Sequence, residues 1–242
     1  MSGDGGERIA KRIARAGVCS RREAERRIYE GRVRLNGQTL PDPAVNVRPR
    51  DLVEVDGAPL PEPEPARLWR YHKPPGLVTT DRDPEGRQTV FDSLPRHLPR
   101  VVSVGRLDLA SEGLLLLTND GGLARDLELP ARGWVRRYRA RVRGRVDEAR
   151  LARIAGGVEI DGERYGPIAA SLDEQRGGNA WVTVSLAEGR NREVRRVLEY
   201  LGHPVNRLIR IAYGPFQLGN LPRSAVAEIR RKAIREQLGR EV

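Results

Sequence analysis

The sequence is poor in the residues that metal and thiol chemistry require. Its 242 residues include one cysteine, Cys19, and three histidines, His72, His97 and His203. One cysteine permits no internal disulfide, and this small set of ligands cannot complete a closed zinc site within one module. We therefore expect neither metal nor thiol catalysis, and an activity that needs no metal ion or other cofactor.

Hallmarks of several common protein classes are also missing. The chain has no phosphate-binding loop, no dinucleotide-binding glycine pattern and no Gly-x-Ser-x-Gly motif, which argues against nucleotide hydrolysis, hydride transfer and serine hydrolysis. No apolar run approaches the roughly 18 residues of a membrane span, and residues 1–12 contain no hydrophobic segment of the signal-peptide type. We expect a soluble, cytoplasmic protein with no membrane partner.

Lysine is scarce, yet the chain is strongly basic. It carries 44 lysines and arginines against 33 aspartates and glutamates, a net charge of +11, and only Lys11, Lys73 and Lys232 are lysines. Arginine favours bidentate contacts with phosphates and base edges. The surplus predicts salt-sensitive attraction to nucleic acid, although a GC-rich genome that favours arginine codons is an alternative explanation.

A proline-rich segment divides the chain. Residues 59–65 read Pro-Leu-Pro-Glu-Pro-Glu-Pro, an alternation typical of an extended, semi-rigid connector. We predict an N-terminal domain over residues 1–60, a linker over 61–65 and a larger domain over 66–242.

The N-terminal domain carries the signals of two helices and a hairpin. The spacing of Ile9 and Ile13 predicts a helix within residues 7–16, and a capping box at residues 20–23 opens a second helix that ends at Gly31. Asn36-Gly37 predicts a two-residue turn between strands. A helix pair followed by a small hairpin is therefore expected.

This arrangement resembles a known RNA-binding module. Residues 7–60, above all 15–25 and 31–37, are similar to the S4 module of ribosomal and RNA-modifying proteins. The resemblance implies contact with structured RNA through basic side chains on the two helices, whereas the alternative is that these side chains only solvate the helix faces. The residues concerned are Lys11, Arg12, Arg15, Arg21, Arg22, Arg26 and Arg27.

The most informative stretch of the larger domain runs from Gly105 to Gly121. Four leucines at 114–117 predict a strand buried on both faces that ends in a turn at residues 119–121. Gly105 and Gly113 bracket a polar loop that contains Asp108. Taken alone, this aspartate could form a turn, join an ion pair or carry out catalysis.

The same stretch resembles the active-site motif of pseudouridine synthases of the RsuA/RluB type, with Ser111 in place of the usual threonine. The resemblance implies that Asp108 attacks uridine, either at C6 of the ring or at C1′ of the ribose, after the nucleotide has been flipped out of its stack. It also implies that Arg106 enters the space that the nucleotide leaves. Residues 71–80 resemble an architectural motif of the family, and we expect no catalytic residue there.

Two further motifs fit the resemblance. Along residues 134–145 arginines alternate with Tyr138, Ala140 and Val142, which predicts a strand with one arginine face. In the family the tyrosine of this motif stacks on the target base, and Tyr138 matches it; without the family it would be taken as a half-buried strand residue.

The last motif begins at Gly189 and contains many arginines. Apolar residues at helical spacing place Arg195 near the start of an amphipathic helix. The resemblance maps onto Arg195 a basic residue that pairs with the catalytic aspartate and favours its ionised form. It maps an apolar pocket wall onto Leu208. Phosphate contacts or simple solvation are expected of Arg190, Arg192, Arg196 and Arg210.

Together these features predict an α+β protein. A small S4-like α/β module would precede a larger catalytic domain built on a mixed, mostly antiparallel sheet with flanking helices. The implied activity converts uridine to pseudouridine in ribosomal RNA or ribosome-assembly intermediates, with large-subunit RNA favoured and a monomer expected. Small-subunit RNA, transfer RNA, or a non-catalytic role in RNA binding remain open alternatives, and the basic helix predicted near the C-terminus departs from the family pattern.

Overall fold

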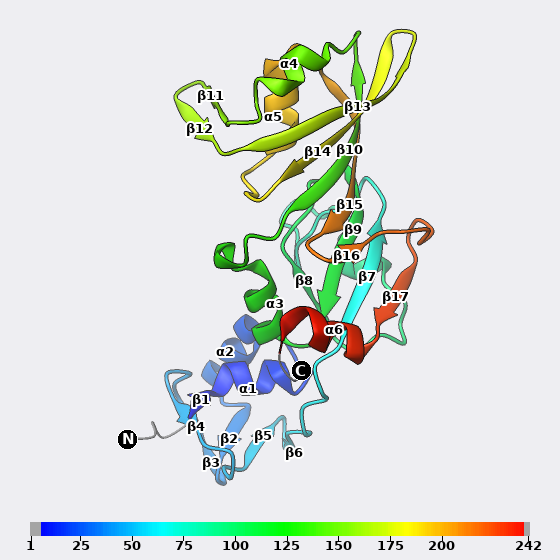
Figure 1. Cartoon of the computed structure of the whole chain (residues 1–242). Coiled ribbons are helices and arrows are strands. Elements are labelled where there is room, and N and C mark those ends of the chain that lie inside the picture. Colours follow the sequence, from blue (N-terminus) through cyan, green and yellow to red (C-terminus); the bar gives the residue numbers. More distant parts are fainter. Residues whose placement is uncertain (1–5, 240–242) are drawn as a thin grey trace.

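A computed structural model describes residues 6–239 (Figure 1). Its N-terminal part, up to Pro59, has a hydrophobic core of its own, formed around Ile9, Ile13, Ile28 and Val33. The elements of this part are β1 (Glu7–Arg8), α1 (Ile9–Arg15), α2 (Arg21–Tyr29), β2 (Val33–Leu35), β3 (Gln38–Thr39), β4 (Asn46–Val47), β5 (Val53–Val55) and β6 (Ala58–Pro59).

The local predictions for this part are confirmed. The Ser20 side chain accepts a hydrogen bond of 3.1 Å from the Glu23 nitrogen and so caps the start of α2, while the Glu23 carboxylate accepts hydrogen bonds from Arg26 and Arg27. Asn36 and Gly37 both have positive φ, at 51° and 81°, which matches the tight turn between β2 and β3. Short, local sequence signals were sufficient here.

The remaining part is built on one large sheet. Its elements are β7 (Leu68–Lys73), η1 (Phe91–Ser93), β8 (Val102–Val104), β9 (Ser111–Thr118), α3 (Gly121–Glu128), η2 (Pro130–Arg132), β10 (Arg136–Arg143), α4 (Glu148–Ala152), β11 (Val158–Ile160), β12 (Glu163–Tyr165), β13 (Ile168–Arg176), β14 (Asn179–Leu186), α5 (Glu193–Tyr200), β15 (Val205–Tyr213), β16 (Phe216–Gln217), β17 (Val226–Ile229) and α6 (Arg231–Leu238).

The strand order across this sheet is β13-β14-β10-β15-β9-β7-β17, with β16 beside β15 and β8 beside β9. All of these strand pairs are antiparallel except β15 with β9. Figure 1 shows α4 and α5 at one end of the sheet and α3 and α6 near the other. The predicted α+β class with a mixed, mostly antiparallel sheet is confirmed.

Strand β9 lies in the interior of this sheet, between β15 and β7. All eight of its residues are buried, as the leucine run predicts, because apolar side chains pack against both faces. Two details differ from expectation. Gly113 belongs to β9 rather than to the preceding loop, and Asp120 caps α3 by accepting a hydrogen bond from the Leu123 nitrogen at 2.7 Å. Strand β17, which precedes the predicted C-terminal helix, was not anticipated.

None of the helices within residues 6–239 is long and apolar enough to cross a membrane. The predicted basic helix near the C-terminus is confirmed as α6, whose Ile234 is fully buried in a core shared with residues of α3 and β9.

Candidate active site

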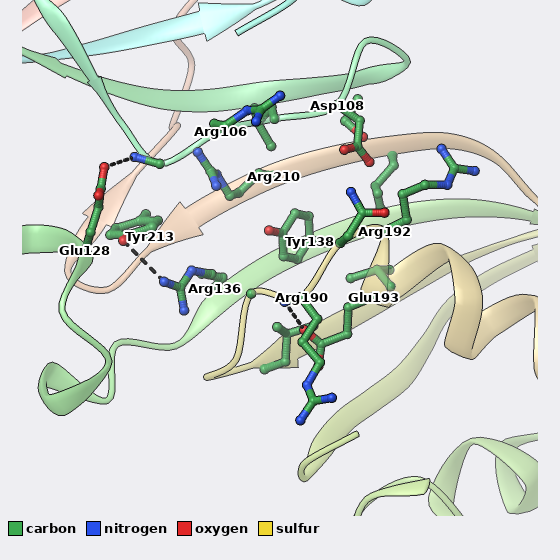
Figure 2. Close-up of a pocket in the computed structure, with 18 residues that line it drawn as sticks. Arg106, Asp108, Glu128, Arg136, Tyr138, Arg190, Arg192, Glu193, Arg210 and Tyr213 are labelled. Atoms are coloured by element: carbon green, nitrogen blue, oxygen red, sulfur yellow. Dashed lines mark hydrogen bonds between the residues drawn. The ribbon is translucent and has the colours of Figure 1, made fainter. Parts of the chain in front are cut away.

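A pocket of about 470 Å³ lies where the loop before β9, strands β10 and β15, and the loop before α5 meet (Figure 2). It gathers side chains from segments that are far apart in the sequence. Seven residues that the sequence analysis gave as catalytic, pocket or phosphate-contact candidates line it, namely Arg106, Asp108, Tyr138, Arg190, Arg192, Leu208 and Arg210. Arg136 and Tyr213 line it as well and had not been assigned to a site.

The loop that carries Asp108 is held by its main chain. The Thr79 hydroxyl donates to the Leu107 carbonyl at 2.9 Å, and the Gly76 nitrogen donates to the Leu109 carbonyl at 2.8 Å. At the loop's first residue, the Gly105 nitrogen donates to Glu128 at 2.6 Å. These bonds leave the Asp108 side chain free to face the pocket on a rigid support.

Lys73 completes this support from beneath the loop. Its side chain is fully buried, and its ammonium donates to the carbonyls of Asp108 at 3.1 Å and Ser111 at 2.8 Å. Burial lowers its pKa to about 8, and the nearby carboxylates of Asp108 and Glu112 oppose that shift. The motif at residues 71–80, expected to be architectural, thus positions the loop directly.

The lowered pKa of Lys73 makes stability depend on pH. Between about 8 and its ordinary value of 10.5, the unfolded chain binds more protons than the folded chain, so the free energy of unfolding rises with pH. Relative to Lys73→Met, the wild-type protein should gain about 3 kcal/mol across this window. Urea unfolding of both proteins at several pH values measures the gap, and a gap independent of pH would contradict this assignment.

Tyr138 lies where two hydrophobic clusters of the large sheet meet, and it contacts both. It is half-buried on β10, opposite Val184 of β14 and Arg210 of β15. The pairing of β10 with β15 is irregular between Arg137 and Tyr138, and such bulges commonly redirect a side chain beside an active site. Tyr138 can therefore present its ring to the pocket from a strand interior.

Leu208 and Arg210 approach the loop through the parallel pairing of β15 with β9. Leu208 lies beside Ser111 and is buried, as a pocket wall should be. Arg210 lies beside Gly113 and is only 2% exposed, so the expectation that it contacts phosphates or solvent at the surface is wrong. Its Nε donates to the Leu114 carbonyl at 2.7 Å, because the strand register turns this side chain inward.

Arg195 lies in α5, as predicted, but its hydrogen bonds are with the main chain. Its guanidinium donates to the carbonyls of Ala110 and Val205, both at 3.0 Å, and no ion pair joins it to Asp108 among residues 6–239. Burial lowers its pKa, Arg192 adds to that effect and Asp108 opposes it. Arg195 thus ties the end of the Asp108 loop to the start of β15.

The loop before α5 is also constrained. Arg192 adopts a left-handed conformation with φ of 52°, which is uncommon outside glycine and concentrates at functional sites. The buried Glu193 accepts a hydrogen bond of 2.9 Å from the Arg190 nitrogen. The Arg190 side chain itself pairs with Glu163 and Glu188, so its charge is partly neutralised at the pocket rim.

The basic residues predicted on the N-terminal helices are of two kinds. Arg12 donates to the carbonyls of Arg48 and Pro49, while Arg15 pairs with Glu7 and Arg26 with Glu23. Lys11 lies 4.0 Å from Glu7. By contrast, Arg21 and Arg22 are exposed, and their side chains have no hydrogen-bond or ion-pair partner within the described part of the chain. A cleft between α1, α2 and the start of α3 is lined by Lys11, Arg15, Arg21, Arg22, Arg100 and Arg125.

Comparison with known proteins agrees with this architecture. Residues 67–200 match the family model for RNA pseudouridylate synthases, and residues 7–53 match that of the S4 domain. The chain belongs to the RNA pseudouridine synthase family. It is therefore an isomerase of the RsuA/RluB group with an N-terminal S4 domain.

Two curated relatives of this pseudouridine synthase span most of its length. An uncharacterized RNA pseudouridine synthase of Rickettsia felis is 49% identical over 228 residues, covering 94% of this chain and 99% of the relative. Ribosomal large subunit pseudouridine synthase B of Yersinia pestis is 43% identical over 239 residues, covering 94% of this chain and 74% of the relative. A solved pseudouridylate synthase is 27% identical with a TM-score of 0.65, covering 96% of this chain and 99% of that one.

Proposed function

We propose that this pseudouridine synthase modifies a specific uridine of ribosomal RNA, with large-subunit RNA as the favoured substrate. The observation that carries the proposal is the single pocket that combines Asp108 on a fixed loop with Tyr138, Leu208 and several arginines. The similarity to the Yersinia pestis large-subunit enzyme supports the choice of RNA. The protein would act on this ribosomal RNA, or on a ribosome-assembly intermediate that contains it, in the cytoplasm.

The chemistry is an intramolecular exchange of bonds. The C1′–N1 bond breaks and a C1′–C5 bond forms, while N1 gains a proton and C5 loses one, so the reaction has no net redox change. We assign Asp108 as the nucleophile, acting at C6 or at C1′. The Arg195 guanidinium, fixed to the carbonyl of Ala110, would hold the end of the loop and contribute a positive field at the carboxylate.

Access to the reacting atoms requires the nucleotide to leave its stack, at a cost of a few kcal/mol. Arg106 is exposed at the pocket rim and is suited to enter the vacated space. Tyr138 and Leu208 would enclose the uracil from β10 and β15. Arg190 and Arg192, at the entrance on the other side, would contact the flanking phosphates.

RNA capture is assigned to the N-terminal domain. We propose that residues 1–60 form an S4-type RNA-binding domain, that 61–65 link it to the rest and that 66–242 form the catalytic domain; the separate core around Ile13 supports this division. Arg21 and Arg22 offer unpaired guanidiniums to phosphates, and Lys11, Arg12, Arg15 and Arg26 lie on the same two helices. A monomer suffices, because one chain supplies the whole pocket.

The substrate can be tested by incubating the purified protein with unmodified transcripts of the large-subunit and small-subunit ribosomal RNAs. Pseudouridine is then mapped by carbodiimide labelling and primer extension. We expect one new stop, in the large-subunit transcript. A stop in the small-subunit transcript alone, or in unmodified transfer RNA incubated in parallel, would overturn the substrate assignment and leave the activity intact.

A further inference from the structure

The arginine strand predicted from the sequence has a surface that the pocket does not use. On β10, Tyr138, Ala140 and Val142 point to the side where α5 packs, and Ala140 and Val142 share a core with Val194 and Leu198 of that helix. The alternate residues point to the opposite side. We define the arginine face as Arg137, Arg139, Arg141 and Arg143 of β10 with Trp181 of β14 and Arg207 of β15.

The charges on this face are only partly balanced. Arg139 lies 3.2 Å from Asp173, and Arg207 pairs with the buried Glu112. The other three β10 arginines of this face, at 137, 141 and 143, are exposed, and their side chains have no hydrogen bond or ion pair with any side chain in residues 6–239. The face therefore carries an uncompensated positive charge.

Strand pairing makes this arrangement costly for the isolated protein. Arg141 lies directly opposite Arg207 across the β10–β15 pair, and like charges in that position destabilise a sheet. Arginines at alternate positions of one strand also repel one another along the same face. A bound polyanion would relieve this repulsion between the arginines, because its negative charges would lie between the guanidinium groups.

An aromatic ring lies within the same charged surface. The indole of Trp181 is half-buried, lies opposite Arg141, and has the guanidinium carbons of Arg139 and Arg207 at 4.8 Å and 5.9 Å from its ring centre. Arginines around an aromatic ring on an open sheet provide both phosphate contacts and a stacking surface. This combination fits RNA better than it fits an acidic protein.

We infer that the arginine face binds the phosphate backbone of an RNA segment other than the one that carries the target uridine. The pocket opens on the opposite side of the sheet, so one local structure cannot occupy both sites. The inference rests on the proposed function, since it adds a second contact with the same large RNA. Its role is affinity and placement of the substrate, not bond rearrangement.

The test compares two triple variants with equal loss of charge. In the face variant Arg137, Arg141 and Arg143 become Gln; in the control variant Arg150, Arg153 and Arg164, which are exposed near α4 and on β12, become Gln. Filter binding of the large-subunit transcript is measured over a series of KCl concentrations. Each lost phosphate contact reduces the magnitude of the slope of log K against log [KCl] by about 0.7–0.9, so we expect a reduction of about 2–3 for the three substitutions of the face variant.

The expected affinity loss of the face variant is about tenfold at physiological salt, with little change for the control. Pseudouridine formation at saturating RNA should keep its wild-type rate, because the pocket is untouched. Equal slopes and affinities for the two variants would overturn the inference. An acidic protein would then be the partner of this face to test. If the wild-type protein formed no pseudouridine, the proposed function would fail. The binding comparison would still test whether the arginine face binds RNA.

Discussion

Asp108→Asn is expected to slow pseudouridine formation by at least about 10⁴-fold and to leave RNA binding within about threefold of wild type. The amide matches the carboxylate in size but is not a nucleophile. The loop should keep its position, because Lys73, Gly76, Thr79 and Arg195 hold it through main-chain carbonyls rather than through the Asp108 side chain.

Single-turnover release of tritium from RNA labelled at C5 of uridine measures this effect, since C5 loses its hydrogen during the reaction. Asp161→Asn is a suitable control. Asp161 lies in the β11–β12 turn with φ of 51°, a conformation that asparagine adopts well. A rate for Asp108→Asn within tenfold of wild type would remove Asp108 from the reacting centre.

Gly113→Ala should be among the most damaging single substitutions outside the pocket. A Cβ atom at Gly113 would lie 2.7 Å from the Arg210 nitrogen and closer still to its carbonyl oxygen, and φ there is +106°. Both contacts are with backbone in the parallel β9–β15 pair, so no side-chain rotation relieves them. We expect a loss of about 3–5 kcal/mol in the free energy of unfolding.

Thermal unfolding tests this prediction, with an expected fall in midpoint of roughly 10 °C or more. The matched control is Gly121→Ala at the start of α3, where φ is not positive and a Cβ meets nothing within 4 Å. That variant should keep or slightly raise the midpoint, because alanine favours helix. Equal midpoints for the two variants would mean that the β9–β15 contact is looser than described.

The sequence predicted well whatever depends on neighbouring residues. Ser20 and Glu23 predict the start of α2, Asn36-Gly37 predicts a turn, and the leucine run predicts β9. The alternation along β10 also predicted its arginine face, because side-chain direction on a strand follows a period of two. The resemblance brought Asp108, Tyr138 and Leu208 to one site before any geometry was known.

Long-range pairing explains what the sequence could not predict. Arg210 is buried because β15 runs parallel to β9, whose residues are about 100 positions earlier, and no local pattern indicates that pairing. The same pairing explains why Gly113 must lack a side chain. Lys73 and Arg195 donate hydrogen bonds to main-chain carbonyl groups. Because every residue has such a group, no sequence motif predicts which carbonyls accept these bonds.

Uridine isomerisation by this protein is tested by a nucleoside balance. The purified protein is incubated with large-subunit ribosomal RNA and no added cofactor, and the RNA is then digested and its nucleosides are counted by chromatography and mass spectrometry. We expect one pseudouridine gained for each uridine lost, at one site per RNA, with no free uracil released. Free uracil without pseudouridine, or an unchanged nucleoside count in every RNA tested, would contradict it.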